Sequence, residues 1–100
     1  MCDTPIKGTA IATEFIDNNR VRVTEWRFAQ RGDNTGWHRH EYDYVIVPIT
    51  TGQLKIIDAQ GEANFSQLES GVSYFRNAGV EHDVINANDH EFSFVEVEFK

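Results

Sequence analysis

The sequence has little cysteine and no long apolar run. Its one cysteine, Cys2, stands beside the start, and a lone cysteine cannot form an internal disulfide, so a disulfide scaffold is excluded. The densest apolar stretch, 44–49, is short and contains Pro48. We therefore expect no membrane span and no signal peptide, and we expect a soluble protein of the cytoplasm.

Basic side chains are also scarce. Lysine and arginine number 9 against 16 aspartates and glutamates, for a formal net charge of −7. Such a chain repels phosphate backbones and has no basic stripe for anionic lipid, so neither nucleic acid nor a membrane is an expected partner. The 100 residues, 40% of them apolar, indicate one globular domain spanning 1–100.

Short runs of strand-forming residues are abundant, and each is followed by a turn signal. Many short strands at such spacing are typical of an all-β sandwich or barrel. Pro48 cannot donate to a strand ladder, so we expect it at a strand end or an edge. The expected strands are Thr9–Ile16, Val21–Phe28, His38–Ile49, Leu54–Asp58, Ala63–Leu68, Val72–Phe75, Val80–Ala87 and Phe92–Phe99.

The last run, 92–99, is apolar in both phases of its alternation. Val95 and Val97 lie on one face, with Glu96 and Glu98 on the other, while the two phenylalanines earlier in the run occupy the phase opposite to the valines. This strand is therefore predicted either to carry a bulge or to be covered on both faces. The second option favours a homodimer.

The segment Trp37-His38-Arg39-His40 places two histidines two residues apart. Residues at this spacing on a strand share a face, so both imidazoles can lean toward one ion. Taken alone, the pair is more typical of an exposed surface than of a metal site.

A second pattern later in the chain changes that interpretation. The first pattern comprises Gly32, His38, His40 and Gly52, and the second comprises Gly71, Asn77, Gly79, His82 and Asn86. In this order and spacing, in an all-β chain, the two patterns resemble the two conserved motifs of the cupin superfamily.

The resemblance implies a double-stranded β-helix, a small jelly-roll cupin barrel. It implies that His38, His40 and His82 match the family's metal-binding histidines, and that small cupins pair through sheet edges and swapped N-terminal strands, as a homodimer would. It also reaches single-domain cupins associated with amino-acid and β-alanine catabolism. The glycines of the two motifs are expected at turns that need positive φ; they are Gly32, Gly52, Gly71 and Gly79.

The sequence departs from the family pattern at two positions. Asn77 replaces a proline, which is mild because asparagine also suits turns. The motif glutamate is absent, and its place falls on Tyr44 by strand parity or on Val45 by spacing to the next glycine. The remaining three-histidine site is neutral, so we expect a divalent transition metal, Fe, Zn, Ni or Cu, in preference to Mg²⁺ or Mn²⁺.

The barrel interior is expected to hold a pocket for a small molecule, lined by Tyr44, Val45, Val84 and Phe94. Tyr44 and Tyr42 are the candidate catalytic residues because they share parity with the histidines; Tyr44 has two alternative roles, as a phenolate ligand or as a hydrogen-bond donor. Arg39 and Arg76 could attract an acidic substrate, although parity points Arg39 outward. Glu81 and Asp83 flank His82 and are expected to face away from the site, although either could support a histidine through a hydrogen bond.

Three functions remain open at this point. The leading one is a metal-dependent enzyme acting on a small organic molecule, either a dioxygenase or a lyase or isomerase. The second is a non-catalytic small-ligand-binding cupin with a degenerate metal site. The third is a metal-free isomerase that uses His40 or His82 as a general base.

Overall fold

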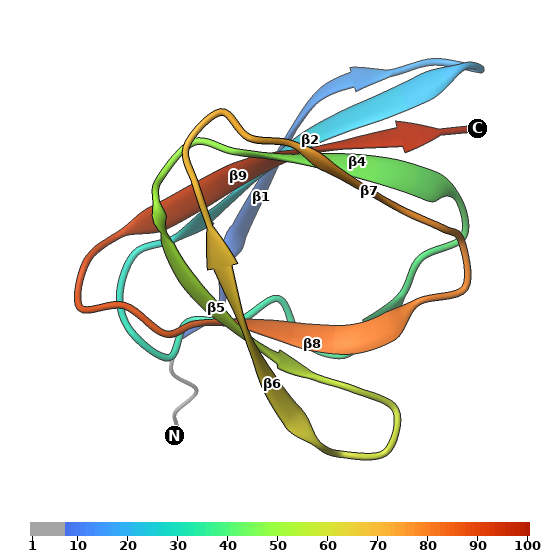
Figure 1. Ribbon diagram of the computed structural model, residues 1–100. Helices are drawn as coiled ribbons and strands as arrows, with labels where there is room; N and C mark the ends of the chain where they lie inside the picture. Colours follow the sequence, from blue (N-terminus) through green and yellow to red (C-terminus); the bar gives the residue numbers. More distant parts are fainter. Residues whose placement is uncertain (1–7) are drawn as a thin grey trace, which may run out of the picture.

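The computed structural model describes residues 8–100, which form nine strands and no helix (Figure 1). The all-β prediction is therefore confirmed, and nothing among these residues is a helix long and apolar enough to cross a membrane. The strands are β1 (Ile11–Asp17), β2 (Val21–Phe28), β3 (His38–Arg39), β4 (Asp43–Pro48), β5 (Gly52–Ile57), β6 (Ala63–Leu68), β7 (Tyr74–Arg76), β8 (Glu81–Asn86) and β9 (Phe92–Phe99).

The strands form two antiparallel sheets, one of five strands in the order β1-β2-β9-β4-β7 and one of four in the order β3-β8-β5-β6. Sequence neighbours repeatedly lie in different sheets, and the chain winds around a central opening (Figure 1). This is the predicted double-stranded β-helix. β4 ends at Pro48, as expected for a residue that cannot donate to a ladder.

One predicted strand, 38–49, is in fact two strands. β3 pairs with β8 in the smaller sheet, whereas β4 pairs with β9 and β7 in the larger one. Between them the backbone of His40 bonds to the β7–β8 turn: its N–H donates to the Val80 carbonyl at 2.9 Å, and its carbonyl accepts from Gly79 N–H at 2.8 Å. These tertiary bonds override the strand propensity of the run.

The core lies between the sheets and takes alternate side chains from both. Phe28 and Phe92 are fully buried with their rings edge to face and the centroids 6.4 Å apart, and the ring of Phe94 lies tilted beside Phe28 with the centroids 5.7 Å apart. Leu54 and Val84 meet them from the four-stranded sheet. This aromatic layer fills one part of the barrel and leaves the histidine region less filled.

β9 carries no bulge, because its register with β2 and β4 runs without interruption. The irregularity of this sheet lies instead in β1, between Glu14 and Ile16. Glu96 and Glu98 therefore share the inner face with the two phenylalanines of β9 and are only 8% and 5% exposed. Buried carboxylates are uncommon without partners, so the contacts of Glu96 and Glu98 determine what this part of the interior can do.

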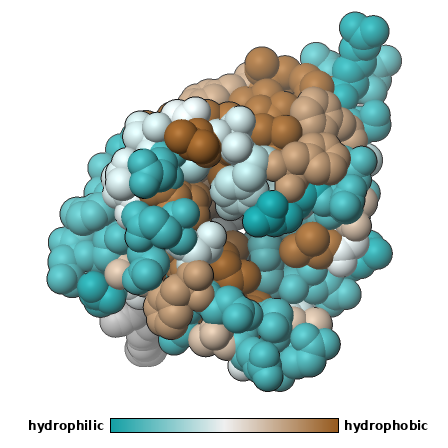
Figure 2. Space-filling model, in the orientation of Figure 1, coloured by the Kyte–Doolittle hydropathy of each residue, from teal (hydrophilic) through white to brown (hydrophobic). Residues whose placement is uncertain are grey.

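The opposite face of the five-stranded sheet includes a row of apolar residues. One register row crosses all five strands, and apolar residues are continuous over the upper edge of the molecule in Figure 2. Every residue of β1 is exposed, on both of its faces. The row comprises Ile16, Val23, Val97, Val45 and Phe75.

Gly52 differs from the expectation for the motif glycines. Gly32, Gly71 and Gly79 have positive φ, but Gly52 does not. A Cβ on Gly52 would lie 2.8 Å from Asn88 Oδ1, which accepts a hydrogen bond from the Gln53 N–H. Glycine is thus required here by close approach rather than by backbone conformation.

Candidate metal centre

The backbone brings the three predicted histidines together. His38 and His82 are direct cross-strand partners in the β3–β8 ladder, so both side chains lie on the same face. His40 follows β3 and is fixed by its two bonds to the β7–β8 turn, where Gly79 adopts a φ of 99°. The turn glycine of the second motif therefore positions a histidine of the first.

The three imidazoles converge through their Nε2 atoms. His40 Nε2 lies 3.1 Å from His38 Nε2 and 3.2 Å from His82 Nε2. Two nitrogens that each lie about 2.1 Å from one ion are about 3.0 Å apart at a right angle and about 3.4 Å apart at a tetrahedral angle. The observed spacing fits three nitrogens on one divalent ion, so His38, His40 and His82 form a group that could hold a metal.

His38 is held in the tautomer that a metal ligand needs. Its Nδ1 lies 2.9 Å from the Gly36 carbonyl oxygen, which can only accept, so Nδ1 carries the proton and Nε2 keeps its lone pair. The Gly36 N–H donates to Asp83 Oδ1 at 3.1 Å. Of the two carboxylates that flank His82, Asp83 therefore supports a histidine, His38, through the loop backbone.

His40 is enclosed on its other sides. Its ring stacks on that of Tyr44 with the centroids 3.9 Å apart, and its Nδ1 lies 3.8 Å from Glu96 Oε2. His40, Glu96 and Glu98 also form a cluster of possible ligands. However, Glu98 is bound by Arg22 through two bonds of 2.7 and 3.1 Å, so Glu96 is the carboxylate that faces His40.

Burial determines the charge states of these groups. Desolvation, followed by the effect of His38, lowers the pKa of His40 to about 4; desolvation and its histidine neighbours lower that of His82 to about 3. Both rings are neutral at pH 7 and free to coordinate. Desolvation, then Glu98, raises the pKa of Glu96 to about 7. Burial also raises the pKa of Tyr44, which disfavours the phenolate ligand considered from the sequence and leaves a neutral phenol.

Two spaces border the histidines, and Glu96 and Trp26 line both. The inner one is a cavity of about 30 Å³ surrounded mainly by apolar side chains of the barrel. The outer one is an open pocket of about 480 Å³ between β1, β2 and the histidines. A ligand of a few heavy atoms could enter the outer pocket, while the inner cavity suits a molecule the size of water.

The structure also locates the other residues named from the sequence. Tyr44, Val84 and Phe94 line the inner cavity. Val45 does not, which corrects its assignment to the pocket: β4 is pleated, so Val45 lies on the outer face opposite Val97. Tyr42 lines neither space; its ring lies 5.9 Å from the Arg22 guanidinium carbon.

Sequence reasoning missed Glu96 and Trp26 as site residues. The signal for Glu96 was present in the alternation of 92–99, because a residue in phase with two core phenylalanines must face the core too. Trp26 shares an inner face with Phe28 in the same way, because the two residues are two positions apart on β2.

Two facing antiparallel sheets wound as a double-stranded β-helix, with three convergent histidines, define a cupin. This chain belongs to the cupin superfamily. A protein of Pseudomonas aeruginosa named beta-alanine degradation protein BauB is 53% identical to it over 91 residues, which are 91% of this chain and 94% of that protein. No family model matches the chain.

Solved structures agree with this assignment. A cupin domain from Bordetella pertussis is 56% identical, covers 97% of this chain and 99% of its own, and superposes with a TM-score of 0.91. An RmlC-like cupin with a double-stranded β-helix fold from Methanocaldococcus jannaschii covers 97% of this chain and 85% of its own at a TM-score of 0.73. The latter is only 14% identical and shows the fold alone.

Proposed function

We propose that this cupin is a metal-dependent enzyme that oxidises a small organic acid, with His38, His40 and His82 holding the ion. The observation that carries the proposal is the convergence of three Nε2 atoms, 3.1 and 3.2 Å apart, beside an open pocket of about 480 Å³. The relative named for beta-alanine degradation supports acids of about three carbons as the substrate class.

Each neighbouring residue has a task that its contacts define. Gly36 holds the proton of His38 on Nδ1, and Tyr44 packs flat on His40. Glu96 faces His40 Nδ1 at 3.8 Å and lines the outer pocket, so it can orient the imidazole from inside a water-poor region. A bound divalent ion would supply Lewis acidity and, if redox-active, electrons for dioxygen.

The inner cavity favours oxygenation over a lyase or isomerase reaction. Its volume of about 30 Å³ accommodates a diatomic gas beside the histidines. The apolar part of its lining, which includes Ile46, Leu54 and Phe94, favours an uncharged occupant such as dioxygen.

The test is oxygen uptake by protein loaded with Fe²⁺, across short carboxylic acids, amines and diketones, with product analysis by NMR. Uptake that matches product formation in the wild type and is lost in His82→Ala supports the proposal. Turnover with Zn²⁺ and without oxygen would favour a lyase or isomerase. Tight ligand binding without turnover would mean a non-catalytic binding cupin instead.

We also propose that the protein is a cytoplasmic homodimer. Support comes from the apolar row on the outer face of the five-stranded sheet and from β1, whose Ile11, Phe15 and Ile16 are 60%, 58% and 46% exposed. A strand with apolar side chains exposed on both faces is a liability for an isolated molecule, and a second copy would cover it.

A further inference from the structure

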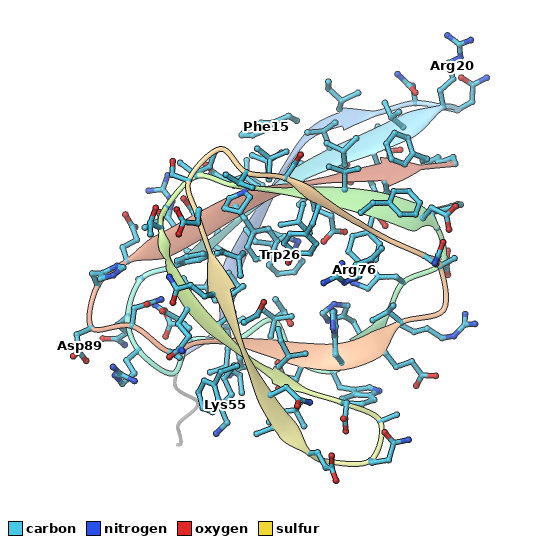
Figure 3. All side chains as sticks on the ribbon, viewed as in Figure 1. Phe15, Arg20, Trp26, Lys55, Arg76 and Asp89 are labelled. Carbon is cyan, nitrogen blue, oxygen red and sulfur yellow. The ribbon has the colours of Figure 1, made fainter. Side chains whose placement is uncertain are left out.

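The side chain of Arg76 projects into the barrel. β7 places Arg76 directly opposite Tyr44, whose side chain is buried inside, so the two share the inner face. Figure 3 shows Arg76 extending into the central opening, above β8. Its guanidinium carbon lies 4.5 Å from the ring centre of Tyr74, which lines the inner cavity. Arg76 is therefore at the edge of the histidine region.

Most of the hydrogen-bonding capacity of Arg76 is unused. Its Nη1 donates to the Phe75 carbonyl at 2.9 Å, which uses one of five N–H groups. Within residues 8–100, no carboxylate forms an ion pair with it. The two arginines that line the outer pocket do have partners: Arg22 binds Glu98, and Arg39 lies 3.8 Å from Glu81.

Arg76 is also an unusual cation for its position. In a chain with a net charge of −7, a cation that is both exposed and directed inward is the exception. Stacking on Tyr74 limits the orientations of the guanidinium, which reduces the entropy lost when it binds an anion.

We propose that Arg76 binds the carboxylate of the substrate while the other end of the same molecule lies at the three histidines. The substrate class is then a short carboxylic acid with an oxygen donor at its far end. This inference rests on the proposed function for the identity of the site. It adds the residue that selects an acid over an uncharged analogue, since a guanidinium fork matches a carboxylate in shape and charge.

The experiment compares 3-hydroxypropionate with its uncharged analogue 3-hydroxypropanamide by calorimetry, in metal-loaded and metal-free protein. The wild type should prefer the acid by about tenfold or more. Arg76→Gln should retain its metal content and lose this preference, and Arg76→Lys should retain part of it. Arg31→Gln is the control, an arginine that already has a carboxylate partner and lines neither space beside the histidines; it should keep the preference.

The outcomes separate this inference from the function it rests on. If Arg76→Gln binds metal and still prefers the acid as the wild type does, Arg76 is only a solvated surface charge and the inference fails while the metal site stands. If the wild type binds no metal, the proposed function fails, and the metal-free titrations still decide the role of Arg76. Equal binding of acid and amide by the wild type would also overturn the inference.

Discussion

In strand β9 two carboxylates face the interior and two valines face outward, which is the reverse of the usual distribution of charged and apolar side chains. The inner face begins with Phe92 and Phe94 and continues with Glu96 and Glu98, whereas the outer face carries Val95 and Val97. The aromatic half of the inner face stabilises the barrel, and the carboxylate half stands beside the histidines at a cost in desolvation. The outer valines contribute to neither and lie in the row where we expect a second copy.

The largest effect should come from the aromatic half. Phe92→Ala removes a fully buried ring that packs edge to face on Phe28, and we expect a loss of about 3–5 kcal/mol in the free energy of unfolding. Urea unfolding at fixed protein concentration measures it. A loss below about 1 kcal/mol would mean that this half does not hold the barrel together.

Removing a charge from the carboxylate half should instead stabilise the protein. The pKa of Glu96 rises from 4.5 to about 7 on folding, so the folded state binds more protons between these values and the metal-free protein loses stability as pH rises through this window. Glu96→Gln removes that penalty. It should be more stable than wild type by about 3 kcal/mol at pH 8 and nearly equal at pH 4.5.

Unfolding curves at both pH values, with chelator present, provide the measurement. The wild type and Glu96→Gln both keep the histidines with lowered pKa values, so the histidines contribute equally to the two free energies of unfolding and cancel in their difference. A stability difference that is the same at pH 4.5 and pH 8 would show that Glu96 titrates normally and that burial does not strain it.

The smallest effect on unfolding should come from the outer face. Val97→Thr changes a half-buried side chain that touches neither core nor site, and we expect less than about 1 kcal/mol in the unfolding of an isolated chain. Its effect should appear in assembly, as weaker self-association by light scattering over a dilution series. Thr24→Ser, inside the barrel, is the matched control. A wild type that is monomeric at all concentrations would contradict the expected dimer.

Much of the fold could be predicted because its determinants are local. Alternation and turn residues marked most strands within a few positions, and the order of the two motifs indicated the barrel. The division of 38–49 could not be predicted, since the backbone of His40 is held by Gly79 and Val80, which are distant in sequence. Only the folded chain brings those groups together.

Site residues whose positions follow from motif spacing or strand parity could be predicted. Those whose role depends on which charged groups are buried could not. His38, His40 and His82 followed from the motifs, and strand parity pointed Tyr44 inward. Val45 was misplaced because counting residues to Gly52 ignores the pleat. Glu96 was missed because carboxylates usually face solvent, although its alternation with Phe92 and Phe94 places it on the buried face.

The central claim is that the three histidines hold one ion. Elemental analysis of protein purified without chelator, then of protein supplemented with Fe²⁺, Zn²⁺ or Ni²⁺, tests it most directly, with His82→Ala as the variant and circular dichroism to confirm its fold. We predict about one equivalent of metal in the wild type and less than about a tenth in the folded variant. Less than about a tenth of an equivalent in the supplemented wild type, or equal metal in both proteins, would contradict it.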